Sequence, residues 1–182
     1  FKFKQVMDLH RKEKEQKLQM KNMKWLWLSF AVVVLDQMSK AVIRYFMTEG
    51  QSLPVLGQFF MLTYTQNTGA AFSLSLGSPA VDRLFFIIIT FVAVGFVLYL
   101  LNLSKHKWQN VGFSLVLGGA LGNVIDRIFL GSVTDFLDCD FPDIIMQRWP
   151  IFNLADSSIV IAMFILAIYI LFFEHKTNLP QA

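Results

Sequence analysis

The chain has 182 residues, of which 55% are hydrophobic and only 16% are charged, and its mean hydropathy is +0.51. This composition excludes an ordinary soluble domain and indicates an integral membrane protein. The formal net charge of +3 does not predict a nucleic-acid partner, because the Lys and Arg residues form no single patch. They gather before the first long apolar run, between the second and third runs, and after the fourth.

Four apolar runs are long enough to cross a bilayer, and they predict transmembrane helices at about 25–46, 84–103, 111–130 and 151–173. The runs lack the alternation of polar and apolar residues that a membrane β-barrel requires. We therefore expect an all-α integral membrane protein with four transmembrane helices. The distribution of Lys and Arg predicts that both termini and the loop between the second and third helices face the cytoplasm.

This organisation predicts a single membrane domain at 25–173 with a polar segment on either side of it. Residues 1–24 are mostly charged and polar, and we expect them to form a cytoplasmic N-terminal extension. Residues 174–182 form a cytoplasmic tail in the same scheme. The segments 47–83 and 131–150 then lie on the outer side of the membrane.

The first helix carries Asp36 and Lys40 in its outer half. Their i,i+4 spacing places both on one helix face, where they can neutralise each other. Such a pair either anchors the helix near the outer surface or belongs to a functional site. In the next segment, aromatic and β-branched residues predict a strand at 55–65 and a short second strand at 70–76.

Asn67 and Gly69 lie between these two predicted strands, in a stretch that has the composition of a turn. The strands predict a small β-sheet cap at the outer face of the membrane. Phe59, Phe60 and Phe72 make this cap apolar, so it is suited to contact with lipid or with an acyl-chain substrate. The second helix carries no charge and is interpreted as scaffold.

The third helix combines small and polar residues. Gly119 belongs to a run of small residues that allows another helix to approach closely. Asn123, Asp126 and Arg127 follow at i, i+3 and i+4, so they lie on one face near the outer end of the helix. Asp126 and Arg127 can also form an ion pair at the membrane interface.

The segment after the third helix contains several acids. Asp135 lies in a short apolar stretch, whereas Asp138, Asp140 and Asp143 belong to a part that we expect to be mostly solvated, and we assign these three no role. Cys139 is the only Cys of the chain and has no partner for an internal disulfide.

The fourth helix starts close to Asn153 and Asp156, and the helix dipole stabilises Asp156 there. The first and third helices run outward and carry their polar residues late, whereas the fourth runs inward and carries them early. The polar side chains should therefore share one layer beneath the outer surface. This layer contains Asp36, Lys40, Asn123, Asp126, Arg127, Asp135, Asn153 and Asp156.

The chemistry of this layer rests on carboxylates. All three His residues lie in expected cytoplasmic segments, so we expect no metal site, no cofactor and no Ser-His pair. Two carboxylates held close at low dielectric can share a proton and act on water as general base and general acid. This is the chemistry of an aspartyl protease, and the residues leave Asp126, Asp135 and Asp156 as candidates for the pair.

Two alternatives belong to other functional classes. An ion-coupled transporter could use the same carboxylates, but no ionisable residue continues inward along helices two to four and there is no inverted repeat. A purely structural membrane subunit explains neither the shared depth of the polar residues nor the acids that lack partners.

Five motifs together resemble the family of lipoprotein signal peptidases, also called signal peptidase II, over about residues 23–173. The motifs are Asp36-x-x-Ser39-Lys40, Asn67-Thr68-Gly69-Ala70-Ala71-Phe72, the run from Gly118 to Arg127, Val133-x-Asp135-Phe136, and Phe152-Asn153-x-Ala155-Asp156. Their order and spacing make the resemblance specific, although each motif alone is weak. The segment between Asp135 and Asn153 is a little longer than in many members of the family.

The resemblance implies a multi-pass aspartyl endopeptidase of the bacterial cytoplasmic (inner) membrane. Such an enzyme cleaves the signal peptide from diacylglyceryl-modified prolipoproteins just before the lipidated Cys, and peptide inhibitors of the globomycin type bind to it. The implied catalytic residues are Asp135 and Asp156. The implied supporting residues are Asp36, Lys40, Asn67, Gly69, Gly119, Asn123, Asp126, Arg127, Asn153 and Ala155. We expect lipidated prolipoproteins and membrane lipid as partners, and a monomer.

Overall fold

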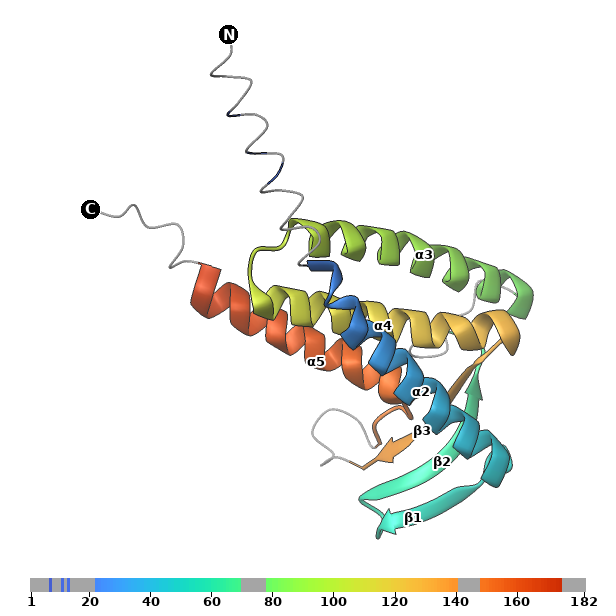
Figure 1. Ribbon diagram of the computed structural model, residues 1–182. Helices are drawn as coiled ribbons and strands as arrows, with labels where there is room; N and C mark the ends of the chain where they lie inside the picture. The colour runs from blue at the N-terminus through green and yellow to red at the C-terminus, as the bar shows by residue number, and fades with distance from the viewer. Residues whose placement is uncertain are drawn as a thin grey trace.

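Figure 1 shows the computed structural model of the protein, which describes residues 7, 11, 13, 22–69, 78–140 and 148–174. Its long helices are α2 (Leu26–Phe46), α3 (Pro79–Leu103), α4 (Lys107–Phe129) and α5 (Leu154–Tyr169), the last continued by the π-helix η2 (Ile170–Glu174). Each is long and apolar enough to cross a membrane, when α5 is taken through to Phe173. The prediction of four membrane helices is therefore confirmed.

The ends of the helices differ from the predicted ones because capping, and not hydropathy, decides where a helix begins. α3 begins at Pro79 instead of residue 84, since the Ser78 side chain accepts a hydrogen bond from the Val81 N–H and Pro is favoured in the first turn. α5 begins at Leu154 instead of residue 151, with Asn153 as its N-cap. α4 also begins earlier than predicted, at Lys107 instead of residue 111, but its N-cap His106 makes no side-chain capping hydrogen bond.

α4 is the central helix of the bundle and packs against α2, α3 and α5 (Figure 1). Its glycines permit this close packing. A side-chain carbon at Gly119 would collide with the Ala155 carbonyl oxygen of α5, and one at Gly122 would lie 2.6 Å from the Asp36 carboxylate of α2. The predicted surface of small residues is thus the place where α4 meets two neighbouring helices.

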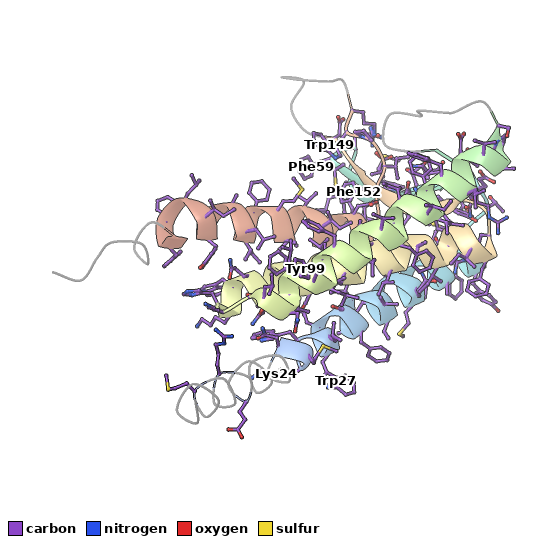
Figure 2. The ribbon with its side chains drawn as sticks, turned by 90° about the horizontal axis from the view of Figure 1, so that it is seen from above. Lys24, Trp27, Phe59, Tyr99, Trp149 and Phe152 are labelled. Atoms are coloured by element: carbon purple, nitrogen blue, oxygen red, sulfur yellow. The ribbon has the colours of Figure 1, made fainter. Side chains whose placement is uncertain are left out.

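The outer surfaces of the bundle are strongly apolar. On α2, α3 and α5 respectively, Trp27, Phe96 and Phe164 are each more than half exposed, Trp27 by 74%. Figure 2 shows Trp27 pointing away from the other helices, close to Lys24 at the start of α2. A helix surface that exposes large apolar side chains along its length fits contact with lipid and not with water.

A three-stranded antiparallel sheet lies at one end of the bundle, beside the end of α2 and the start of α5 (Figure 1). Its strands are β1 (Ser52–Leu56), β2 (Phe60–Asn67) and β3 (Val133–Cys139), in the order β1-β2-β3. The strand predicted at 55–65 was wrong as a single element. Gly57, with φ +58°, supports a turn that divides it into the hairpin of β1 and β2.

The third strand, β3, was not predicted. It comes from the segment after α4, where no strand was expected. Polar and apolar residues alternate only weakly along β3 because both of its faces are covered. Val133 and Phe136 are buried on this strand. The short strand predicted at 70–76 lies outside the described residues.

An apolar core joins the sheet to the helices. Ile43 and Met47 at the end of α2 pack with Phe136 of β3, and side chains from β2 and α5 complete the cluster. Phe152 also forms a β-bridge with Leu137, which ties the start of α5 to β3. The sheet thus holds β3 against the ends of α2 and α5, where the polar side chains of all three elements meet.

Candidate active site

Asp135 lies near the start of β3 and is almost fully buried, with 3% of its surface exposed. Gly131, with φ +85°, allows the chain to turn sharply between α4 and this strand. One carboxylate oxygen of Asp135 accepts a hydrogen bond from Asn153 Nδ2 at 2.6 Å, and the other accepts one from Asn67 Nδ2 at 3.1 Å. Both oxygens are therefore oriented by amide donors from other elements.

Asp156 lies in the first turn of α5, where the helix dipole favours a negative charge. It forms a capping box with Asn153, whose backbone N–H donates to Asp156 Oδ2 at 3.2 Å. Asn123 Nδ2 of α4 donates to the other oxygen at 2.7 Å. Asp156 is only half-buried, whereas Asp135 is almost fully buried.

Asn153 connects the two acids. Its side-chain oxygen accepts the Asp156 backbone N–H at 2.9 Å, while its Nδ2 donates to the Asp135 carboxylate. The same nitrogen lies 3.0 Å from Asn123 Oδ1. Because Asn153 is fully buried and all its polar atoms are used, it fixes the two carboxylates relative to each other.

Lys40 is fully buried and supplies positive charge beneath this pair. Its ammonium lies 2.8 Å from the Asp36 carboxylate, so the predicted i,i+4 pair is confirmed. It also donates to Asn123 Oδ1 at 2.9 Å, which orients the amide that binds Asp156. Asp36 in turn accepts the Ala155 backbone N–H at 3.0 Å and so holds the start of α5 against α2.

Asp126 is bound in a way that separates it from the other two candidate acids. Its carboxylate lies 3.5 Å from Lys40 and 3.7 Å from Arg44, and it accepts the Thr134 backbone N–H at 2.9 Å. These cations and donors occupy both of its oxygens. Asp126 thus belongs to an ion-pair network with Lys40 and Arg44, whereas Asn153 contacts both Asp135 and the Asp156 backbone.

The expected ion pair between Asp126 and Arg127 was wrong, because adjacent residues of a helix do not face each other. Arg127 instead donates to the Gly69 carbonyl oxygen at 3.3 Å and lies over the Phe86 ring at 5.1 Å. Gly69 also donates its N–H to Asn67 Oδ1 at 3.1 Å. Arg127 thus holds the end of the β2 segment that carries Asn67 close to Asp135.

Burial and charge together change the acidity of Asp135. Its pKa is raised from 3.8 to about 6, mainly because burial disfavours the ionised form and further because of the negative charge of Asp156. The hydrogen bonds from Asn67 and Asn153 and the charge of Lys40 oppose this rise. A carboxyl group with such a pKa can both accept and release a proton near neutral pH.

The sequence reasoning missed several polar residues around the acids. Gln37 donates to both Asp36 and Asp126, at 3.2 and 3.1 Å. Arg44 binds Thr134, and helical spacing could have identified it because it follows Lys40 by four residues. The positions of Thr134 and its further partners depend on the unpredicted strand β3.

Asp138 is buried and not solvated as expected, with 5% of its surface exposed. It accepts hydrogen bonds of 2.6 Å from the Thr63 hydroxyl and from Arg148 Nε. Arg148 also lies 3.7 Å from Asp140. These contacts connect β2, β3 and the segment before α5, so Asp138 stabilises the sheet at a distance from the Asn153 bridge.

Within the described residues, no group of three or more His, Cys, Asp or Glu side chains could hold a metal ion. Cys139 is a free thiol on β3. The site offers carboxylates, amides and three buried or half-buried cations, Lys40, Arg44 and Arg127, and this set fits proton transfer.

The chain is similar to known proteins over most of its length. The family model described as signal peptidase (SPase) II matches residues 28–172. Lipoprotein signal peptidases of Aeromonas hydrophila and Pseudomonas aeruginosa are 40% and 41% identical, covering 76% and 79% of this chain and 83% and 85% of theirs. A solved bacterial membrane enzyme structure, determined in meso at 2.3 Å resolution, superposes with a TM-score of 0.75 at 32% identity and covers 87% of this chain and 93% of its own. The chain belongs to the signal peptidase II family of membrane proteases.

Proposed function

We propose that this protein is an aspartic endopeptidase that removes the signal peptide from diacylglyceryl-modified prolipoproteins, cutting just before the lipidated Cys. The family supports signal-peptide cleavage, since its relatives carry the name lipoprotein signal peptidase. The observation that carries the proposed chemistry is the Asn153 bridge, which binds Asp135 at 2.6 Å and the Asp156 backbone at 2.9 Å.

In the proposed mechanism, Asp135 and Asp156 share one proton and flank the scissile peptide bond. The ionised acid takes a proton from a water molecule, whose oxygen forms a bond to the peptide carbonyl carbon. The protonated acid then gives its proton to the amide nitrogen as the C–N bond breaks. The products are the carboxyl end of the signal peptide and the free amine of the lipidated Cys. The raised pKa of Asp135 supports such proton exchange.

The surroundings of the pair fit a substrate that arrives through the bilayer. The four helices expose apolar surface to lipid, and on β1 the side chains Leu53, Val55 and Leu56 are also exposed. We propose that this face contacts membrane lipid and the diacylglyceryl tail. Inhibitors of the globomycin type are expected to occupy the same place, with the supporting residues named above holding the acids in position.

We further propose a monomer in the bacterial inner membrane, with both termini in the cytoplasm and the acids near the outer face. Cys139 on β3 provides a native probe of this orientation, because it is the only Cys of the chain and is partly exposed. A membrane-impermeant maleimide should label Cys139 in intact spheroplasts. In a Cys139→Ser background, a Cys placed at Lys105 should react only after lysis. Labelling at Lys105 alone in intact cells would reverse the proposed orientation.

The catalytic proposal is tested with a purified diacylglyceryl-modified prolipoprotein and a gel-shift assay in detergent. Asp135→Asn and Asp156→Asn should each reduce the cleavage rate by about 10²-fold or more, the range expected for loss of a general acid or base. Asp138→Asn is the matched control, since it makes the same change on β3 away from the bridge, and it should retain cleavage. Mass spectrometry of the product should place the lipidated Cys at its N-terminus. Cleavage at the wild-type rate by both the Asp135 and Asp156 variants would refute the proposal.

A further inference from the structure

Thr134 precedes Asp135 on β3 and is held by hydrogen bonds at every polar atom of its backbone and side chain. Its N–H donates to Asp126 at 2.9 Å, and its carbonyl oxygen accepts from Asn153 at 3.3 Å. Its hydroxyl accepts from Arg44 at 2.9 Å and from Gln66 at 3.5 Å. Thr134 is fully buried, so the solvent cannot replace these partners.

Of the two described side chains that bind the Thr134 hydroxyl, Arg44 is the charged one. It comes from α2, whereas Thr134 lies on β3. It lies in the last turn of α2, with 26% of its side chain exposed, and its Nη1 binds Thr134 at the same time as it pairs with Asp126 at 3.7 Å. Because Asp126 also binds the Thr134 N–H, Arg44 and Asp126 grip the residue before Asp135 from two sides. A shift of Thr134 along the strand would break both contacts.

Arg44 also contributes to the charge balance around the buried acids. Two buried carboxylates, Asp36 and Asp126, face two cations, Lys40 and Arg44. Without Arg44, Lys40 would be the one cation within 4 Å of either carboxylate among the described residues. Lys40 also orients Asn123, which binds Asp156, so a displaced Lys40 disturbs the other member of the pair as well.

We propose that Arg44 is a positioning residue for the reaction, which holds Asp135 at the correct place through Thr134 and keeps Lys40 free to orient Asn123. This inference rests on the proposed function, because it requires Asp135 and Asp156 to be the reacting acids. Arg44 touches neither carboxylate of the pair, so its effect is on the chemical step and not on the apolar surface that binds the substrate.

Steady-state kinetics of prolipoprotein cleavage test this role. Arg44→Met and Thr134→Val should each lower kcat by about tenfold and change KM by less than about twofold, since small displacements of reacting groups reduce the rate strongly. Arg44→Lys, which keeps a charged donor, should recover at least half of the lost activity. The double variant should be no slower than the slower single variant, because both changes remove the same contact.

Arg83→Met is the matched control. Arg83 donates to the Ile128 carbonyl oxygen at 2.6 Å, so it is also an arginine bound at the end of a membrane helix, but among the described residues no hydrogen bond or ion pair links it to Thr134 or Asp126. It should leave kcat unchanged. A wild-type kcat in Arg44→Met, an equal loss in Arg83→Met, or independent effects of Arg44 and Thr134 in the double variant would each overturn the proposal. If Arg44→Met does not fold, Thr134→Val decides by the same criterion.

Asp135→Asn, measured beside these variants, separates the two hypotheses. An inactive Asp135→Asn with a fully active Arg44→Met would refute the positioning role alone. An active Asp135→Asn would remove Asp135 from the proposed catalytic pair and with it the premise of the positioning role, whatever the result for Arg44.

Discussion

Replacement of Asp135 by Asn should make the protein inactive and should remove a loss of stability that the wild type undergoes as pH rises towards neutral. The pKa of this buried carboxyl is raised from 3.8 to about 6 in the folded protein, so its ionisation opposes folding. At about 1.36 kcal/mol per pKa unit, this difference corresponds to about 3 kcal/mol. This contribution to the stability of the wild type is fully present below pH 3.8 and is lost as pH rises through about 6.

Asn cannot ionise, so this loss is absent in Asp135→Asn. The variant also changes the hydrogen bonds from Asn67 and Asn153, but that effect does not depend on pH. The decisive quantity is therefore the difference in stability between variant and wild type as a function of pH. It should shift in favour of the variant by up to about 3 kcal/mol between pH 4 and pH 7, or by about 6–12 °C in Tm.

The assay is thermal unfolding in detergent at several pH values, followed by the fluorescence of the four Trp residues. Thr90→Val is the control, because it removes a hydroxyl that, among the described residues, binds only the Phe86 carbonyl oxygen of its own helix and removes no titratable group. Its Tm difference from the wild type should stay constant with pH. A Tm difference for Asp135→Asn that is equally constant from pH 4 to pH 7 would refute the reasoning that burial raises this pKa.

Further expectations follow from the same geometry. The kcat/KM of the wild type should show a limb with an apparent pKa near 6 if Asp135 titrates in the reaction, and a flat profile from pH 5 to 7.5 would contradict this. Lys40→Met leaves Asp36 without its 2.8 Å partner and should cost about 3–5 kcal/mol, seen as a large fall in Tm that Asp36→Asn partly reverses. Gly119→Leu should lower Tm by at least several degrees, because its side chain meets a carbonyl oxygen of α5, whereas Gly95→Leu on open helix surface should not.

The membrane helices could be predicted from the sequence because hydropathy alone decides whether a segment is stable in lipid. The shared position of the polar residues could also be predicted, since the alternating direction of successive helices determines it. The Asp36–Lys40 pair followed from helical spacing and is present in the structure. These inferences needed only local periodicity and chain direction.

The sheet was harder to predict because its contacts join residues far apart in the chain. β3 pairs with β2 across some 70 positions, with Thr65 opposite Asp135, and no local pattern marks this register. The missed contacts of Thr134 and the buried position of Asp138 both depend on it. The supporting residues Asn67, Asn123 and Asn153 were expected from the motifs, but the pairing of β3 that brings Asn67 to Asp135 was not.

The double use of Asn153 links folding to enzymatic competence. The same side chain caps α5 and joins the two acids, so the start of this helix cannot be complete while β3 is displaced. Asp36, which binds the Ala155 N–H, places the same requirement on α2. If Asp135 and Asp156 are the reacting acids, as proposed, a chain whose last helix has not docked lacks the contacts that hold them together, and activity would arise only with completed insertion.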